Sequence, residues 1–413
     1  MSVKKKVVHV LSVFPSKSET FVVNLVLESL RHDFSAQIMA GIIADIDNSS
    51  QGDLINKNSL YPHAKTYNTK IPPEKYKRVV KALFLLLRNL KHFKVFIRTL
   101  NSKKYGLKSK SLKMWFQAGE FLQHRDAEVF HGHFGINGLL LAQMKEIGAI
   151  RGRLIVSYYG YDTFSTANDR DYVKEQNQLT FNLAECIFVS SNYLKKNLLM
   201  LNAPEDKIKV NCVGVNTALF SYKVRTTSDI FKIITVGRLI ALKGQDLGLK
   251  VIEILKSRGC NIQYTIVGDG EEMESLKRKA KVYSITDKVI FLGSAMQAEI
   301  IELLHSHHLF LMTSITDNTG RAEGQGLVTA EAQSTGMPVV GFNSGGISET
   351  ISDSKTGFLV DEKDVIAMAD KVEFLIKNRN IYDKLSKSAR AFIEQNFNNQ
   401  KQSNNILEHY SYE

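Results

Sequence analysis

The chain has 413 residues, of which 44% are hydrophobic and 23% charged, and its formal net charge is +12 at pH 7. This composition is that of a folded globular protein and excludes a disordered chain, while the length predicts two or three domains. The longest apolar run, residues 82–87, is much shorter than the roughly 20 residues of a membrane span, so we expect no transmembrane helix.

Apolar, β-rich segments alternate with helical patterns in the first half of the chain. We expect strands at residues 6–14, 36–43, 127–134, 153–159 and 185–190. Such alternation is typical of a parallel sheet that helices cover on both faces. We therefore predict that residues 1–215 form one α/β domain.

The excess positive charge lies within this first domain. Residues 70–113 hold fourteen lysines or arginines and one acid, Glu74, so the rest of the chain is close to neutral. Apolar residues recur there at the spacing of an amphipathic helix: Val79, Leu83, Leu86, Leu90, Phe93 and Ile97. A basic amphipathic helix is typical of a surface that contacts anionic membrane lipids, and a solvated helix that aids solubility is the equal alternative. Nucleic-acid binding is less favoured, because no matching motif accompanies the charge.

A polar segment, residues 216–230, is the predicted linker to a second α/β domain at residues 231–390. Its expected strands are residues 231–237, 263–268, 288–293, 309–314 and 337–342. Residues 391–413 are expected to form a C-terminal helix that crosses back to the first domain. Because open α/β sheets bind ligands beyond the carboxyl ends of their strands, we expect the site in a cleft between the domains.

Two loops of the second domain carry candidate phosphate-binding residues. Arg238 and Lys243 follow the strand at 231–237, and fixed cations beside a glycine suit a diphosphate. Gly268 and Gly270 follow the next strand, where glycine lets backbone approach a ligand. Taken alone, that second loop fits a plain turn better, because it lacks the full G-x-G-x-x-G pattern.

The segment EGQGLVTAE holds two acids eight residues apart, Glu323 and Glu331. No lysine or arginine occurs between Arg321 and Lys355, so a helix offers Glu331 no cation at i±3 or i±4. At about 1.5 Å per residue the acids lie on the order of 12 Å apart, which suits the two ends of a nucleotide sugar. A buried carboxylate needs hydrogen bonds, which a pair of sugar hydroxyls would supply. The alternative for Glu323 is that it only complements the helix dipole.

These motifs together resemble the retaining family 4 glycosyltransferases (glycosyl transferases group 1) of the GT-B fold. The family's E-x7-E motif lies within EGQGLVTAEAQSTGMPVVGFNSGGISETI, and GRLIALKG, IVGDGEEMESLK, VIFLG and TGFLV also match. In the first half, VFPSKSETFVVNLVLESL, FHGHFGING and YYGYDTFS resemble the exopolysaccharide and colanic-acid branch. The resemblance covers essentially the whole chain. It implies two facing Rossmann-like, doubly wound parallel-sheet domains with an interdomain cleft.

The resemblance also assigns roles to residues. It implies that Arg238 and Lys243 bind the donor diphosphate, Glu331 the ribose, and Glu323 the transferred sugar. His133 would reach that sugar from the first domain, although a strand-end histidine, like His131 beside it, is more often structural. The remaining implied donor-binding positions are Gly268, Gly270, Ser294, Ala295, Met296, Gly324, Gln325, Gly326, Leu327 and Val328. The implied acceptor-side positions are Ser18, Glu19, Thr20, Tyr159, Gly160 and Asp162.

Two features depart from the family pattern. Residues 15–20, after the first strand, contain no glycine, so we expect this loop to contact the acceptor differently. Where many relatives have H-G-x-D, this chain has Tyr159-Gly160-Tyr161-Asp162, so the role of that histidine does not carry over to Tyr159.

The resemblance implies retaining transfer of a hexose, preferably from a UDP-sugar, to a saccharide or lipid-linked acceptor in cell-surface polysaccharide biosynthesis. No cofactor or metal is expected: Asp45-Ile46-Asp47 matches a D-x-D metal pattern of a different glycosyltransferase fold, and the histidines at 305–308 lack zinc-ligand spacing. Cys186, Cys212 and Cys260 suit a reducing cytoplasm, where the protein would lie at the inner face of the cell membrane. The alternatives are a sugar-nucleotide 2-epimerase and a non-catalytic basic protein that binds membrane or nucleic acid.

Overall fold

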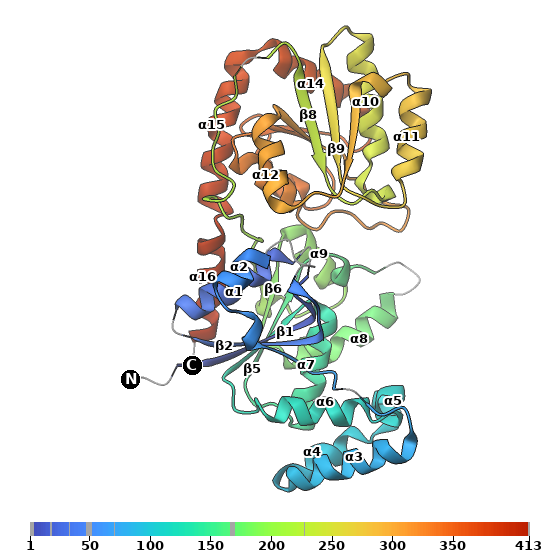
Figure 1. Cartoon of the computed structure of the whole chain (residues 1–413), viewed down its shortest axis with the longest axis vertical. Coiled ribbons are helices and arrows are strands. Elements are labelled where there is room, and N and C mark those ends of the chain that lie inside the picture. Colours follow the sequence, from blue (N-terminus) through green and yellow to red (C-terminus); the bar gives the residue numbers. More distant parts are fainter. Residues whose placement is uncertain are drawn as a thin grey trace.

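The computed structural model describes residues 4–16, 19–32, 34–46, 52–69, 71–165, 170–226 and 228–411. Two parallel sheets form two lobes stacked along the long axis of the molecule (Figure 1). Each lobe has hydrophobic core clusters of its own, the largest around Phe130 in the first and Tyr264 in the second. A separate core for each sheet is what defines two domains.

The first sheet has the strand order β3-β2-β1-β4-β5-β6-β7. Its strands are β1 (Lys6–Phe14), β2 (Ser35–Ile43), β3 (Ala64–Thr66), β4 (Val129–His133), β5 (Arg153–Tyr158), β6 (Cys186–Val189) and β7 (Ile208–Val210). Every strand expected for this half is present. The two that the sequence pattern did not predict, β3 and β7, are three-residue strands at the sheet edges.

Helices cover this sheet on both faces. They are α1 (Thr20–Arg31), α2 (Gly52–Lys57), α7 (Gly135–Ile147), α8 (Arg170–Leu183) and α9 (Asn192–Met200). Because β1 leads into α1 and β4 into α7, the N-termini of these helices lie at the carboxyl edge of the sheet, which faces the second lobe (Figure 1).

The basic region forms a helical subdomain at the end of the first lobe farthest from the second (Figure 1). It consists of α3 (Lys75–Arg88), α4 (Phe93–Thr99), α5 (Ser102–Lys110) and α6 (Lys113–Leu122). The apolar stripe expected on one helix is divided, because α3 ends at Arg88 and α4 starts at Phe93. Most of the stripe is also exposed rather than buried: Leu83 is 54% and Ile97 57% exposed, whereas Leu86 packs against the core.

The second sheet has the strand order β10-β9-β8-β11-β12-β13, the doubly wound order whose direction reverses between β8 and β11. Its strands are β8 (Phe231–Val236), β9 (Ile262–Val267), β10 (Val289–Gly293), β11 (Leu309–Met312), β12 (Val339–Phe342) and β13 (Gly357–Val360). The helices are α10 (Gln245–Ser257), α11 (Met273–Val282), α12 (Gln297–Ser306), α13 (Leu327–Ser334) and α14 (Val365–Lys377). Only the edge strand β13 was not predicted as a strand.

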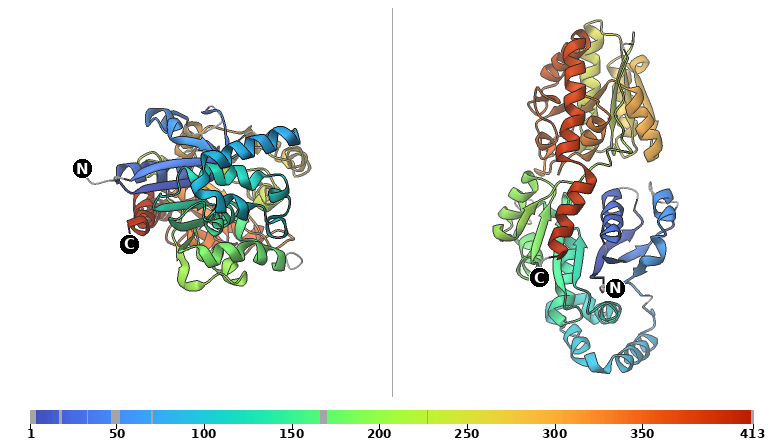
Figure 2. Two further views of the ribbon diagram at one scale, coloured as in Figure 1. Left: turned by 90° about the horizontal axis from the view of Figure 1, so that it is seen from below. Right: turned by 90° about the vertical axis from the view of Figure 1, so that its left-hand side faces the viewer.

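The chain passes between the lobes twice. In the first passage, buried Arg225 donates to the carbonyls of Leu304, His307 and Thr335, which holds the linker against the second lobe. In the second, α15 (Arg379–Asn396) runs along the second lobe and α16 (Asn399–Ser411) along the first (Figure 2). None of the described helices is long and apolar enough to cross a membrane.

Candidate active site

A cleft of roughly 1070 Å³ lies between the lobes. From the first lobe it is lined by α1 and α2, through Thr20, Asn24, Asp53, Leu54 and Lys57. From the second lobe it is lined by α12 and α13, through Gln297, Ala298, Ile301, Leu327 and Glu331, and the linker closes it at residues 214–216, 219 and 220. This is the position that the doubly wound sheets predict for a ligand.

Glu331 is a half-buried carboxylate in the wall of this cleft. Among the described residues it has no hydrogen-bond or ion-pair partner. Its helical neighbours Thr329 and Gln333 point the other way and bond to the side chain and carbonyl of Thr350, which fixes α13. Burial raises the pKa of Glu331 to about 7. An acid kept there without a partner is costly to stability and suits a ligand that donates hydrogen bonds.

Glu323 and Lys243 form an ion pair within the second lobe, and their side chains are 19% and 18% exposed. Lys243 is held in place by Thr313, whose hydroxyl donates to the Lys243 carbonyl at 2.9 Å. Arg238 lies on the same loop, where Gln245 donates to its carbonyl, and its own side chain is exposed. The structure therefore places a cation beside the first acid of the motif and a second cation on the same loop.

Gly268 and Gly270 are required by packing between loops. A Cβ on Gly268 would lie 1.9 Å from the carbonyl oxygen of Gly237, and one on Gly270 would lie 2.3 Å from that of Leu239. These carbonyls flank Arg238. The two glycines therefore lie against the backbone of the Arg238 loop. They let that loop pack against the end of β9, which sets the position of Arg238.

The residues after Glu323 contact the first lobe. Helix α13 begins only at Leu327, because Gly326 adopts a left-handed conformation with φ of 80°. The Gly324 carbonyl accepts a hydrogen bond of 2.6 Å from Ser191, and the Gln325 side chain bonds to both backbone groups of Val213. Both residues were expected to contact the donor, and in this conformation they also join the lobes. Leu327 lines the cleft, and Val328 packs against a core cluster of the second lobe.

The β10–α12 loop reaches the cleft through a different residue than expected. Ser294 and Ala295 line a separate depression, and the side chain of Met296 is 54% exposed. Gln297, the first residue of α12, is the one that lines the main cleft.

Of the residues predicted to bind the acceptor, some line the cleft and others stabilise the backbone around it. Ser18 lies outside the described residues. Thr20 lines the cleft, and burial raises the pKa of its neighbour Glu19 to about 7. Asp162 instead accepts hydrogen bonds from the backbone of Gly135, Tyr159 and Gly160. It therefore fixes the Tyr159–Gly160 turn, which packs against Gly324 of the other lobe.

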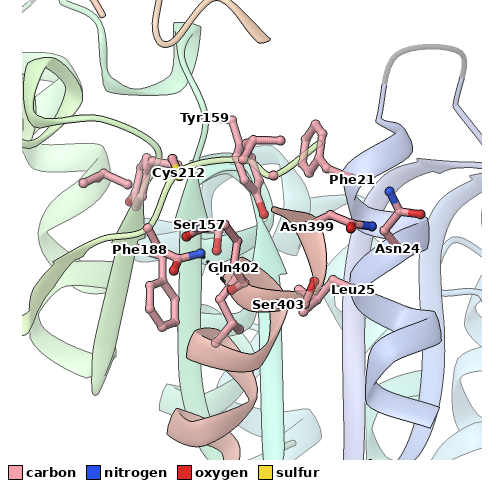
Figure 3. Close-up of a pocket in the computed structure, with 16 residues that line it drawn as sticks. Phe21, Asn24, Leu25, Ser157, Tyr159, Phe188, Cys212, Asn399, Gln402 and Ser403 are labelled. Carbon is pink, nitrogen blue, oxygen red and sulfur yellow. Dashed lines mark hydrogen bonds between the residues drawn. The ribbon is translucent and has the colours of Figure 1, made fainter. Parts of the chain in front are cut away.

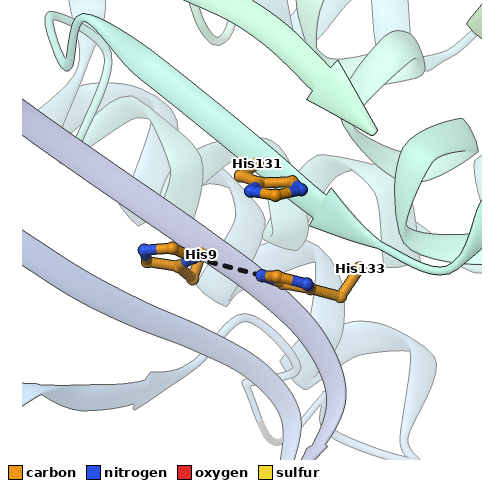
Figure 4. A group of neighbouring side chains, drawn as sticks. All are labelled: His9, His131 and His133. Carbon is orange, nitrogen blue, oxygen red and sulfur yellow. Dashed lines mark hydrogen bonds between the residues drawn. The ribbon is translucent and has the colours of Figure 1, made fainter. Parts of the chain in front are cut away.

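His133 lies behind that turn, in a cluster with His9 and His131 (Figure 4). Its ring is fully buried, with Nδ1 bonded to the Tyr159 hydroxyl at 3.0 Å and Nε2 to His9 at 3.1 Å. Burial lowers the pKa of all three imidazoles. In this conformation His133 does not line the cleft. Tyr159 would have to move before His133 could contact a sugar there.

The three histidines fit a hydrogen-bonded network better than a metal site. One ring nitrogen of each histidine lies within 4.8 Å of one ring nitrogen of each of the other two. Both ring nitrogens of His133 are bonded, to His9 and to the Tyr159 hydroxyl, and are not free to bind a metal. Both nitrogens of His131 are also bonded, to Tyr410 and Ser157. Of the other metal candidates, Asp47 lies outside the described residues, and His307 bonds to Thr265 and Leu303.

A side pocket of roughly 460 Å³ adjoins the cleft and shares Asn24 and Gly214 with it. Figure 3 shows Phe21, Tyr159 and Phe188 together with the amides of Asn24, Asn399 and Gln402 around this pocket. The described residues that line it include no charged side chain, so the cations expected to bind a diphosphate, Arg238 and Lys243, lie elsewhere, in the second lobe.

Known proteins resemble this chain in sequence and in fold. A statistical description of the family "Glycosyl transferases group 1" matches residues 221–392. WcaL of Escherichia coli (strain K12), a candidate colanic acid biosynthesis glycosyltransferase, is 30% identical over 397 residues, which is 96% of this chain and 97% of WcaL. The chain belongs to the glycosyl transferases group 1 family.

Further similarities cover nearly the whole length of the chain. The amylovoran biosynthesis glycosyltransferase AmsK of Erwinia amylovora is 27% identical over 93% of this chain and 94% of AmsK. Among solved structures, Anabaena Alr3699/HepE in complex with UDP-glucose aligns with a TM-score of 0.71 at 17% identity, over 98% of this chain and 99% of that one. The expected GT-B fold is confirmed.

Proposed function

We propose that this glycosyltransferase moves a hexose from a UDP-sugar to a saccharide or lipid-linked acceptor in exopolysaccharide biosynthesis, with retention of the anomeric configuration. The observation that carries the proposal is Glu331, an acid in the wall of the interdomain cleft without a partner among the described residues, with an acid–cation pair of the same lobe, Glu323 and Lys243, outside that cleft's lining. The names of WcaL and AmsK support the pathway, and UDP-glucose bound to Alr3699/HepE supports the donor.

In the proposed reaction, the cations and the N-terminus of α13 stabilise the departing diphosphate. The donor diphosphate replaces Glu323 as the partner of Lys243, and Glu323 is then free to accept hydrogen bonds from the hydroxyls of the transferred sugar. As the bond to the diphosphate breaks, the anomeric carbon becomes cationic, and the acceptor hydroxyl attacks from the face that the diphosphate leaves. A diphosphate oxygen takes the proton of that hydroxyl. No metal is needed for this charge balance.

A panel of nucleotide sugars tests this function. Incubation of the protein with UDP- and GDP-hexoses, without acceptor, should show slow hydrolysis of one donor and a raised melting temperature with the matching nucleotide. Release of an epimerised nucleotide sugar would instead favour a 2-epimerase. If no nucleotide raised the melting temperature, a non-catalytic basic protein would be favoured.

Donor binding should depend on pH through Glu331. Because burial raises its pKa to about 7, this group is mostly protonated at pH 6 and mostly ionised at pH 8. If the ribose hydroxyls donate to the ionised form, the affinity for UDP should rise up to about tenfold across that range. Without ligand, the raised pKa of Glu331 makes the folded protein less stable at higher pH. The free energy of unfolding falls as the pH rises from the ordinary pKa of a glutamate to about 7, because the folded state holds its proton longer than the unfolded state.

Calorimetry of UDP binding at several pH values measures this rise. The variant Glu331→Gln is the control for titration of UDP itself. The UDP affinity of this variant varies with pH only through the ligand and the other titratable groups of the protein. An identical pH dependence in wild type and variant would remove Glu331 from the ribose site.

We further propose that the enzyme works on the inner face of the cell membrane, against an anionic lipid surface. The α3–α6 subdomain combines exposed apolar side chains with the basic residues of 71–113. The apolar ones include Tyr76, Val80, Phe84, Leu87, Leu90 and Leu107, which are between 55% and 82% exposed. Exposed apolar groups among lysines and arginines are the composition of an interfacial membrane surface.

Co-sedimentation with liposomes should detect this contact. We expect the protein to pellet with vesicles that contain phosphatidylglycerol, and to stay in solution with phosphatidylcholine vesicles or at high salt. Replacing Leu87 with aspartate or Lys91 with glutamate should weaken binding by roughly fivefold or more, since each surface cation contributes about 1 kcal/mol. Val282→Asp and Lys384→Glu, on exposed positions of the second lobe, are the matched controls. If the fraction of protein that pellets did not change with lipid charge or salt concentration, the proposal would be excluded.

A further inference from the structure

A carboxylate of the second lobe binds the N-terminus of a helix in the first lobe. Glu349, at the end of the short 3-10 helix Ile347–Glu349, accepts three hydrogen bonds from the start of α9. Its Oε2 accepts from the backbone N–H and the side-chain amide of Asn192 at 2.8 and 2.9 Å, and its Oε1 accepts from the N–H of Tyr193 at 2.9 Å. The first N–H groups of a helix lack partners within it and carry partial positive charge, which an acid complements.

The same segment supports the backbone that carries Glu323. The N–H of Gly346 donates to the Glu323 carbonyl at 2.8 Å. A Cβ on Gly345 would lie 2.4 Å from the carbonyl oxygen of Glu323, and one on Gly346 would lie 2.1 Å from that of Gly324. Residues 345–349 therefore connect the first lobe, through Glu349, to the turn at Glu323.

From this arrangement we infer that Glu349 is a positioning residue that couples closure of the lobes to the orientation of Glu323. Its hydrogen bonds to Asn192 and Tyr193, here called the interdomain latch, form only when the lobes are as close as in this structure. The latch then fixes the 345–346 turn behind Glu323, next to the Ser191–Gly324 bond. Neither Glu349 nor Glu323 is among the described residues that line the cleft, and residues 345–346 contact the backbone of Glu323 and Gly324, so the latch acts on the Glu323 turn. Only the kinetic part of this inference rests on the proposed function.

Two variants break the latch from opposite lobes. Glu349→Ala removes the acceptor of all three hydrogen bonds, and Asn192→Asp places a second negative charge against Glu349. Glu274→Gln is the matched control, because Glu274 belongs to an exposed ion pair on α11 with 71% of its side chain accessible. Small-angle X-ray scattering with and without UDP, calorimetry of UDP binding, and steady-state kinetics are measured for each.

We expect both variants to have a larger radius of gyration than wild type and kcat lowered about tenfold or more, because charge-assisted hydrogen bonds are lost. UDP affinity and the far-UV spectrum should stay at wild-type values, which separates loss of positioning from loss of folding. The inference is overturned if either variant scatters like wild type, or if it scatters differently but keeps the wild-type kcat. If wild type turned over no nucleotide sugar, the proposed function would fail, while the scattering comparison would still decide whether the latch closes the lobes.

Discussion

Replacing Glu323 with glutamine should lower kcat by about 10²- to 10³-fold, the usual cost of removing one preorganised polar group from a reacting centre. In the proposed complex, Glu323 accepts hydrogen bonds from the transferred sugar, and an amide can neither carry the charge nor accept through both atoms. UDP affinity should not fall, because the substitution frees Lys243 from its ion pair. Kinetics with the donor found in the nucleotide-sugar panel, together with calorimetry of UDP, measure the two effects.

The exposed control for this substitution is again Glu274→Gln, which should keep the wild-type kcat. A loss of UDP affinity in Glu323→Gln equal to its loss of kcat would contradict the assignment, because it would place Glu323 on the nucleotide rather than on the sugar.

Replacing Lys243 with methionine should reduce both UDP affinity and kcat. The change preserves much of the side-chain length and removes the charge that the diphosphate needs. Charged hydrogen bonds contribute about 1.5 to 3 kcal/mol, so we expect UDP affinity to fall roughly 10- to 100-fold. Uridine, which has no phosphate, should bind both proteins equally, and calorimetry with UDP and uridine separates the two contributions.

Lys277→Met provides the matched control, because Lys277 lies in an exposed ion pair with Glu274. An equal loss of UDP and uridine affinity in Lys243→Met would show that the substitution disturbs the cleft rather than a phosphate contact. Unchanged UDP affinity would place the diphosphate elsewhere.

The sequence predicted the internal strands of both sheets because each is rich in apolar residues, most of which the sheet buries. The partly exposed edge strand β10 was predicted as well. The strands it did not predict, β3, β7 and β13, lie at sheet edges and have only three or four residues, too few to show a pattern; β3 and β7 are also partly exposed, whereas β13 is largely buried. The helix expected across residues 79–97 failed for another reason. Its apolar stripe has the helical period, but periodicity does not reveal that the backbone turns after Arg88 or that the stripe faces outward.

At the site, the spacing of Glu323 and Glu331 and the absence of nearby cations were visible in the sequence. The contacts between lobes were not, because Ser191, Gln325 and Glu349 lie far from their partners in the chain, and the motif that contains Gln325 does not show what its side chain meets in the other lobe. The burial of His133 also depends on His9, which joins it only because β1 and β4 pair in the sheet. Local patterns predict residue chemistry, whereas strand pairing and domain closure decide which groups meet.

A crystal structure of the protein with UDP is the most direct test of the central claim, that the cleft between the lobes binds a nucleotide sugar between an acid and two cations. We predict the ribose hydroxyls on the Glu331 carboxylate and the diphosphate on Arg238 and Lys243, with Lys243 released from Glu323. UDP bound away from Glu331 and from the two cations, or bound with Glu331 still without a partner, would contradict the claim.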